Sequence, residues 1–151
     1  MSGSTFGVIN GIIDMLALLT GLWATKVSKI GIIGAIIALV ISNPFNDSYA
    51  LYLSEENENE KGQTNEKAKK KATYALVSQL TTHLMFLIIV ILSPNTTVAL
   101  ITSFICSGLL IFGFNLYNKV PINKTGNTII IISILVGLTY LADNAVYKYL
   151  H

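Results

Sequence analysis

The chain has 151 residues, of which 52% are apolar and only 12% charged, and its formal net charge is +2. Its mean hydropathy is +0.62. Charged residues make up about a quarter of a typical soluble domain, so this composition excludes an ordinary soluble domain and favours a membrane protein. All ten basic residues are lysines, placed mostly beside acids, which gives no support to nucleic-acid binding.

The apolar residues fall into blocks of about twenty, the length that crosses a hydrocarbon core about 30 Å thick. We therefore predict a single all-α domain, residues 1–151, in which five transmembrane helices form a polytopic bundle surrounded by membrane lipid. The predicted spans are 6–24, 30–53, 72–92, 97–117 and 128–147. A polar connector, 54–71, has glutamates first and lysines last, and we expect it to extend spans two and three as helices joined at Gly62.

Span one carries small and polar residues every three or four positions, which places them on one face. Two of them, Asn10 and Asp14, are one turn apart. Small residues at this spacing let a second helix backbone approach closely, and we expect a homodimer to form through this face. The stripe consists of Gly7, Asn10, Gly11, Asp14, Ala17 and Gly21.

Span two is unusually polar for membrane depth between Ser42 and Ser48. Asn43 and Asp47 share a face, with Asn46 beside them. Pro44 lacks an N–H and clashes with the carbonyl group four residues earlier, so we expect a kink there. The carbonyl freed by Pro44 needs a partner, for which a cation, a hydroxyl group and water are alternatives.

The lysines predict the topology, because cytoplasmic loops are enriched in basic residues. With the N-terminus in the cytoplasm, seven lysines lie on that side and three on the other, so we expect a cytoplasmic N-terminus and a luminal C-terminus. At about 1.5 Å per residue, Asp14 and Asp47 lie about 12 and 9 Å from the cytoplasmic edge. Two antiparallel spans therefore bring their polar residues to one level.

Carboxylates within a membrane span are costly and are functional by default. In a low dielectric a carboxylate holds a proton more tightly, and an approaching cation displaces it, which is a physical basis for metal–proton exchange. We therefore predict Asp14 and Asp47 as ligands of a divalent metal ion, with Asn10, Asn43 and Asn46 as neutral ligands. The alternative is that these side chains hydrogen-bond to one another and only hold the helices together.

Other polar residues have weaker functional interpretations. Glu55, Glu56 and Glu58 could gather cations at the cytoplasmic mouth, although charge runs usually form solvated connectors. His83, on one side of span three with Gln79 and Thr82, could relay protons; a lone membrane histidine is more often bound to a backbone carbonyl. Asp143, near the opposite surface, could be a second relay group or could simply reach water.

Three stretches resemble the vacuolar iron transporter family: Gly7–Gly11, Leu16–Gly21, and Asn43–Ser54, which ends in Tyr-Leu-Ser followed by glutamates. Family members show Gly-Leu-Ser-Asp-Gly, Phe-Ala-Leu-x-Ala-Gly and Glu-Tyr-Leu-Ser at the corresponding places. The chain departs from this pattern. Asn10 stands where the family has aspartate, Asp47 where it has methionine, and Leu51 where it has glutamate.

This resemblance implies a dimeric exporter of Fe²⁺ or Mn²⁺ that moves metal from the cytosol across a vacuolar or other endomembrane in exchange for protons. Many family members carry a cytosolic helical metal-binding domain between spans two and three, where this chain has only the short connector 54–71. We expect no resident cofactor, since the metal is the transported substrate. The sequence shows no paired nucleophile and base, no phosphate-binding loop and no haem-binding motif, so we do not expect an enzyme. The alternative function is a non-transporting membrane protein kept for structure or assembly.

Overall fold

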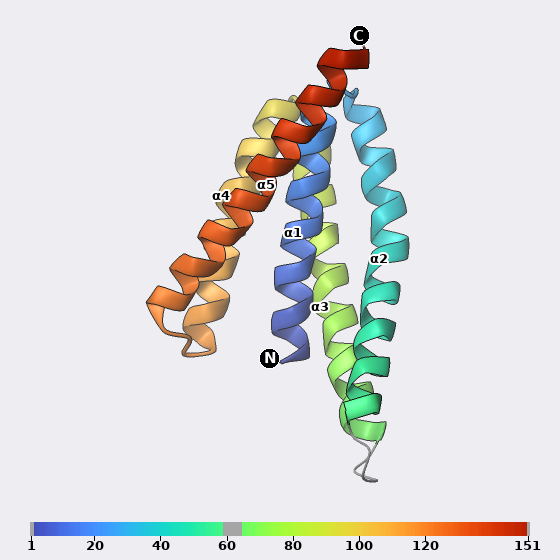
Figure 1. Ribbon diagram of the computed structural model, residues 1–151, viewed down its shortest axis with the longest axis vertical. Coiled ribbons are helices and arrows are strands. Elements are labelled where there is room, and N and C mark those ends of the chain that lie inside the picture. The colour runs from blue at the N-terminus through green and yellow to red at the C-terminus, as the bar shows by residue number, and fades with distance from the viewer. Residues whose placement is uncertain (1, 59–64, 151) are drawn as a thin grey trace.

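The computed structural model describes residues 2–58 and 65–150, and it is helical in all five predicted spans (Figure 1). Each helix is long and apolar enough to cross a membrane, which confirms the predicted all-α bundle of five spans. The two termini lie at opposite ends of the bundle (Figure 1). The helices are α1 (Gly3–Ala24), α2 (Lys29–Glu58), α3 (Asn65–Leu92), α4 (Thr96–Tyr117) and α5 (Ile122–Leu150).

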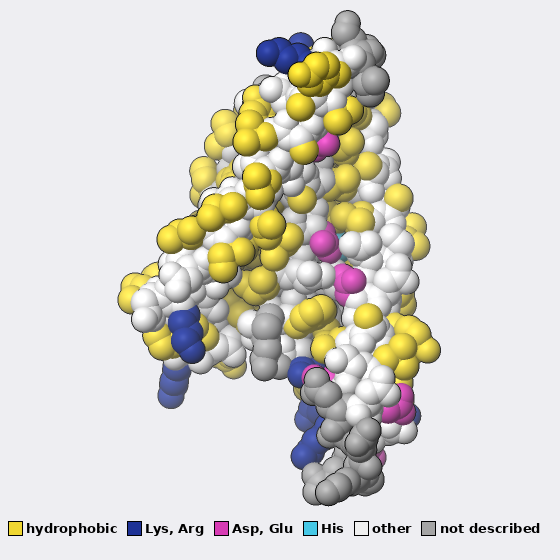
Figure 2. Space-filling model, viewed as in Figure 1, with side chains coloured by type: hydrophobic (Ala, Val, Ile, Leu, Met, Phe, Trp, Pro, Cys, Tyr) yellow, Lys and Arg dark blue, Asp and Glu magenta, His cyan; other side chains and the backbone are white. Residues whose placement is uncertain are grey.

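Helix α1 is the centre of the bundle and contacts each of the other four helices. Half of its span is buried, 50% against 11% for α5. Apolar side chains cover most of the outer face of α5 (Figure 2), as expected of a helix that faces lipid. The ends of α2 and α3 near the connector diverge from the facing ends of α4 and α5 (Figure 1). On α1 the side chains of Asn10, Asp14 and Ala17 are only half-buried, and we call this side of the helix its open face.

The glycines of α1 allow α3 to approach very closely. A Cβ atom on Gly3 would collide with the Lys71 carbonyl oxygen, and one on Gly7 with that of Ala75. At Gly11 it would lie 3.1 Å from Thr82 Cβ. Helix α3 of the same chain therefore covers the glycines Gly7 and Gly11 of the predicted dimer stripe, whereas Asn10, Asp14 and Ala17 of that stripe are only half-buried. The dimer itself stays a prediction.

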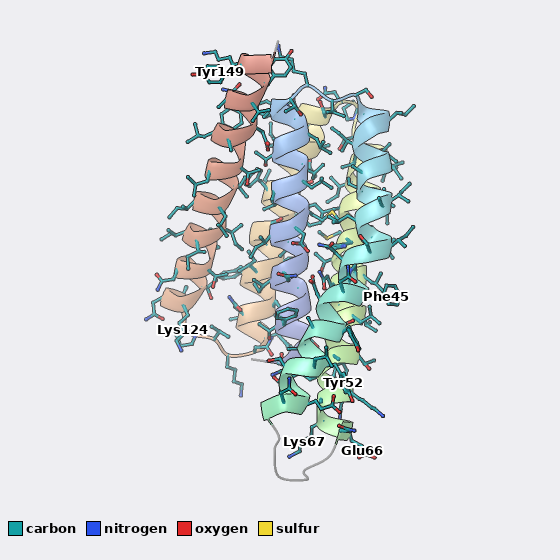
Figure 3. All side chains as sticks on the ribbon, turned by 45° about the vertical axis from the view of Figure 1, so that its right-hand side comes forward. Phe45, Tyr52, Glu66, Lys67, Lys124 and Tyr149 are labelled. Carbon is teal, nitrogen blue, oxygen red and sulfur yellow. The ribbon has the colours of Figure 1, made fainter. Side chains whose placement is uncertain are left out.

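The connector is largely helical, as predicted. Helix α2 continues to Glu58 and α3 begins at Asn65, while the expected joint at Gly62 lies outside the described residues. Lys71 of α3 pairs with Glu55 of α2, which ties the two extensions together. The described residues at this polar end thus belong to α2 and α3 (Figure 3).

Pro44 lies inside α2 without ending it. The helix changes direction near Phe45 (Figure 3), as the predicted kink requires, because proline removes one helical hydrogen bond and its ring crowds the preceding turn. Just before this bend, Ser42 Oγ donates to the Ala38 carbonyl oxygen at 3.0 Å. The bend directs the polar half of α2 across α3.

Candidate metal site between three helices

Three helices each contribute a pair of polar side chains that are one turn apart. Helix α1 supplies Asn10 and Asp14, both half-buried, and α2 supplies Asn43 and Asp47, also half-buried. A spacing of four residues places both members of a pair on one helix face. The third pair, on α3, is Gln79 and His83, and both side chains are completely buried.

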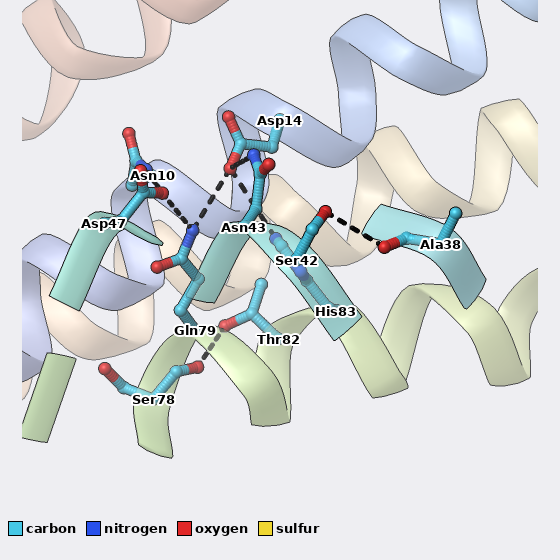
Figure 4. Close-up of polar contacts among 10 residues, drawn as sticks. All are labelled: Asn10, Asp14, Ala38, Ser42, Asn43, Asp47, Ser78, Gln79, Thr82 and His83. Atoms are coloured by element: carbon cyan, nitrogen blue, oxygen red, sulfur yellow. Dashed lines mark hydrogen bonds and ion pairs between the residues drawn. The ribbon is translucent and has the colours of Figure 1, made fainter. Parts of the chain in front are cut away.

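The pairs on α1 and α2 bind each other reciprocally (Figure 4). Asn10 Nδ2 donates to Asp47 Oδ2 at 2.6 Å, and Asn43 Nδ2 donates to Asp14 Oδ2 at 3.2 Å. This cross-pairing follows from the antiparallel direction of the two helices, since the amide precedes the acid by one turn on both. The predicted level shared by Asp14 and Asp47 is thus present in the structure.

Gln79 of α3 joins the two carboxylates. Its Nε2 donates to Asp47 Oδ2 at 2.6 Å and to Asp14 Oδ2 at 3.2 Å. One amide group therefore lies between the two acids (Figure 4). Gln79 was expected on the same side of α3 as His83, but it had no predicted role because an amide is not ionisable. Its position one turn before a histidine in a membrane span was the signal that could have identified it.

The buried pair on α3 has hydrogen-bonding atoms that remain without a partner. These atoms are Gln79 Oε1 and both ring nitrogens of His83. The Nε2 atom of His83 is 3.7 Å from Asp14 Oδ2, too far for a hydrogen bond. The expected bond from His83 to a backbone carbonyl group is not formed. A buried polar atom without a partner costs about 1–3 kcal/mol, so the site is incomplete on its α3 side.

The site also has little positive charge. Among the described residues, His83 is the only basic side chain with a nitrogen within 4.0 Å of either Asp14 or Asp47. Acidic side chains reach the surface midway along the open face, in a hollow between α5 and α2 (Figure 2).

The remaining predicted residues lie away from this cluster. Asn46 is exposed on α2. Asp143, half-buried on α5, lies against Gly21 of α1. At the connector, Glu55 pairs with Lys71.

Of the other two glutamates at the connector, Glu56 accepts a hydrogen bond from Tyr52 at 3.0 Å. The side chain of Glu58 lies outside the described residues. Glu55 therefore joins the ends of α2 and α3, whereas Glu56 bonds within α2.

Any metal bound here needs amide oxygens or water as well as acids. In the described part of the chain, no three His, Cys, Asp or Glu side chains are grouped so as to hold a metal ion. Amide oxygens are suitable ligands for hard divalent cations, and Asn10, Asn43 and Gln79 all have their amide groups at the two carboxylates. Each can present its oxygen by turning its terminal torsion, because the two ends of an amide are similar in shape.

Neither family models, nor curated proteins, nor solved structures give a match to this chain. The resemblance to vacuolar iron transporters therefore rests on the motifs in the first two spans.

Proposed function

We propose that this protein is a proton-coupled transporter of divalent metal ions, moving Fe²⁺ or Mn²⁺ out of the cytosol across an organellar membrane. The observation that supports it most is the convergence of Asp14 and Asp47, from different helices, on one buried amide group. Acids within a span are rare and mark ion pathways and proton relays. Here they lie beside the open face of the central helix.

The coupling to protons follows from charge balance. With no metal bound, protons on the carboxylates reduce the negative charge between the helices. A divalent cation that reaches Asp14 and Asp47 replaces these protons, because the cation supplies the same charge compensation. Release of the metal on the other side then requires that protons return. Each transport cycle thus exchanges metal for protons.

The homodimer remains part of the proposal, through the part of the predicted stripe that this chain leaves half-buried. Since α3 covers the glycine face of α1, a second copy would pack on the open face, where Asn10, Asp14 and Ala17 are only half-buried. A carboxylate left towards lipid is costly, and a partner helix would shield it. A disulfide formed between copies of Ala17→Cys would support this interface; cross-linking only from cysteines on the outer face of α5 would contradict it.

A non-transporting structural role is the second candidate, and one observation favours it. Asp47 Oδ2 already accepts two hydrogen bonds of 2.6 Å from amide groups, so the acids could serve only to join three helices. In that case asparagine should replace both acids with little loss, since amide–amide hydrogen bonds can take over.

The test is metal uptake into proteoliposomes with an imposed pH gradient. Wild type should take up Fe²⁺ or Mn²⁺ in proportion to the gradient, and the double variant Asp14→Asn, Asp47→Asn should fold and carry no flux. Ser42→Ala is a matched control, because Ser42 is an exposed polar residue of α2 that bonds to its own helix. Folded wild type without flux of any divalent ion would overturn the transporter and favour the structural role.

A further inference from the structure

We infer that α3 supplies the ligand that selects the metal: His83 binds it through Nε2, together with the carboxylate of Asp14. The site would then prefer ions that accept imidazole, such as Fe²⁺ and Co²⁺, over Mg²⁺ and Ca²⁺. This inference rests on the proposed function and adds a third helix and a nitrogen ligand to it.

His83 is buried beside Asp14 without a hydrogen bond. Its exposed fraction is 0%, and neither ring nitrogen has a hydrogen-bond partner. Buried imidazoles normally donate from one nitrogen and accept at the other. An imidazole that does neither, beside an acid in a membrane span, has a nitrogen available to coordinate a metal ion.

The distance between His83 and Asp14 suits a bridging metal ion. Ligand bonds from imidazole nitrogen and carboxylate oxygen to a small divalent ion are both about 2.1 Å long. His83 Nε2 and Asp14 Oδ2 are 3.7 Å apart. For an ion bonded to both atoms at that bond length, the N–metal–O angle would be about 120°. That angle is close to tetrahedral and trigonal geometry. The same gap is too wide for a direct hydrogen bond.

The other ring nitrogen of His83, Nδ1, also lacks a hydrogen-bond partner. When a histidine binds a metal, its second N–H usually donates to an acceptor that fixes the ring. One turn earlier on α3, Gln79 Oε1 is a buried acceptor without a donor. Gln79 Oε1 thus needs a donor and the His83 ring has one to offer, and the two side chains lie on the same face of α3. Metal binding fixes the tautomer with hydrogen on Nδ1, which is the donor that such an acceptor requires.

Imidazole nitrogen changes which ions are favoured. Carboxylates, carbonyl groups and water suit Mg²⁺, Ca²⁺ and Mn²⁺, whereas imidazole suits Fe, Ni, Cu and Zn. With Asp14 and Asp47 alone, the site would hold Mg²⁺ about as readily as a transition ion. His83 is then the residue that makes the site prefer transition-metal ions over Mg²⁺, which is the commoner competitor in a cell.

The experiment compares Co²⁺ and Mg²⁺ uptake in the same proteoliposomes for wild type and His83→Gln. Glutamine offers oxygen in place of nitrogen at a similar reach, so the ratio of Co²⁺ to Mg²⁺ uptake should fall about tenfold or more. His151→Gln removes the other histidine of the chain and should leave the ratio as in wild type. An unchanged ratio in His83→Gln would overturn the inference.

A second measurement reads the bond itself. Pulsed electron paramagnetic resonance of Mn²⁺ bound to wild-type protein should show coupling to one histidine nitrogen, which changes when the histidines are labelled with ¹⁵N and is retained in His151→Gln. This result needs no folded His83 variant. Wild type that transports Mn²⁺ but shows no nitrogen coupling would refute the ligand and leave the transporter standing. Wild type that neither binds nor transports any divalent ion would refute both.

Discussion

The close contact between α1 and α3 predicts the effect of one methyl group at Gly7. An alanine Cβ at Gly7 would collide with the Ala75 carbonyl oxygen and lie 3.0 Å from its carbon. The partner atom belongs to helix backbone, so it cannot turn aside, and α1 and α3 must separate by about 1 Å to restore normal contact. Overpacking of this kind costs about 1–3 kcal/mol of unfolding free energy.

The same change should reach the site, because Gln79 of α3 donates to Asp14 of α1 at 3.2 Å. A further separation of about 1 Å exceeds hydrogen-bond range, so Gly7→Ala should lower metal uptake as well as stability. Stability is measured as unfolding of the purified protein in detergent micelles, followed by circular dichroism.

Gly34→Ala is the matched control, since a Cβ on Gly34 would meet nothing within 4 Å. Alanine gains up to about 1 kcal/mol over glycine in a helix, so the control should be unchanged or more stable. Because this gain is common to both variants, they should differ by the overpacking cost alone, about 1–3 kcal/mol. Equal unfolding curves and equal uptake would refute the argument that α1 and α3 must touch backbone to backbone.

Three further changes test other parts of the structure. Asp47→Met should shift uptake towards softer ions such as Cu⁺, because a thioether replaces a carboxylate; the same metal profile as wild type would contradict the role of Asp47 as ligand. Lys29→Met should lower the unfolding free energy by about 1–2 kcal/mol, because Lys29 Nζ donates to the carbonyl oxygens of Ile91 and Ser93 at 2.9 and 2.6 Å. Lys119→Gly should raise the unfolding free energy by about 1 kcal/mol, since Lys119 has φ 55°, a left-handed conformation that glycine adopts without strain. Unfolding curves measure the effects of Lys29→Met and Lys119→Gly. A change of opposite sign in either variant would contradict the local geometry.

Hydropathy alone predicted the five spans, because a stretch of about twenty apolar residues has few alternatives to a membrane helix. It predicted the ends less well. Helix α5 begins at Ile122, directly after Pro121, and not at 128. Hydropathy marks where side chains become apolar, whereas a helix begins where the backbone first closes its hydrogen bonds, and proline is favoured just at such a start.

The sequence also predicted which face of α1 packs closely, but not against which helix. Residue spacing fixes the face, and a close-packing face looks the same whether its partner is a second copy or a later span. Within the site, Asp14 and Asp47 were found because acids at membrane depth are rare. Gln79 was missed because an amide gives no such signal, although its position between both acids defines the geometry.

The chain itself contains a comparison for what a merely structural polar contact looks like. Between α4 and α5, Asn115 Nδ2 donates to Thr125 Oγ1 at 3.1 Å, and both side chains are buried and neutral. Two hydroxyl groups, on Thr20 and Ser103, lack a partner, but a hydroxyl can turn towards a carbonyl group of its own helix. The imidazole of His83 has no such freedom. A network that served only to join helices would gain stability if this residue were apolar, so its place 3.7 Å from Asp14 agrees with the role proposed for it as a metal ligand.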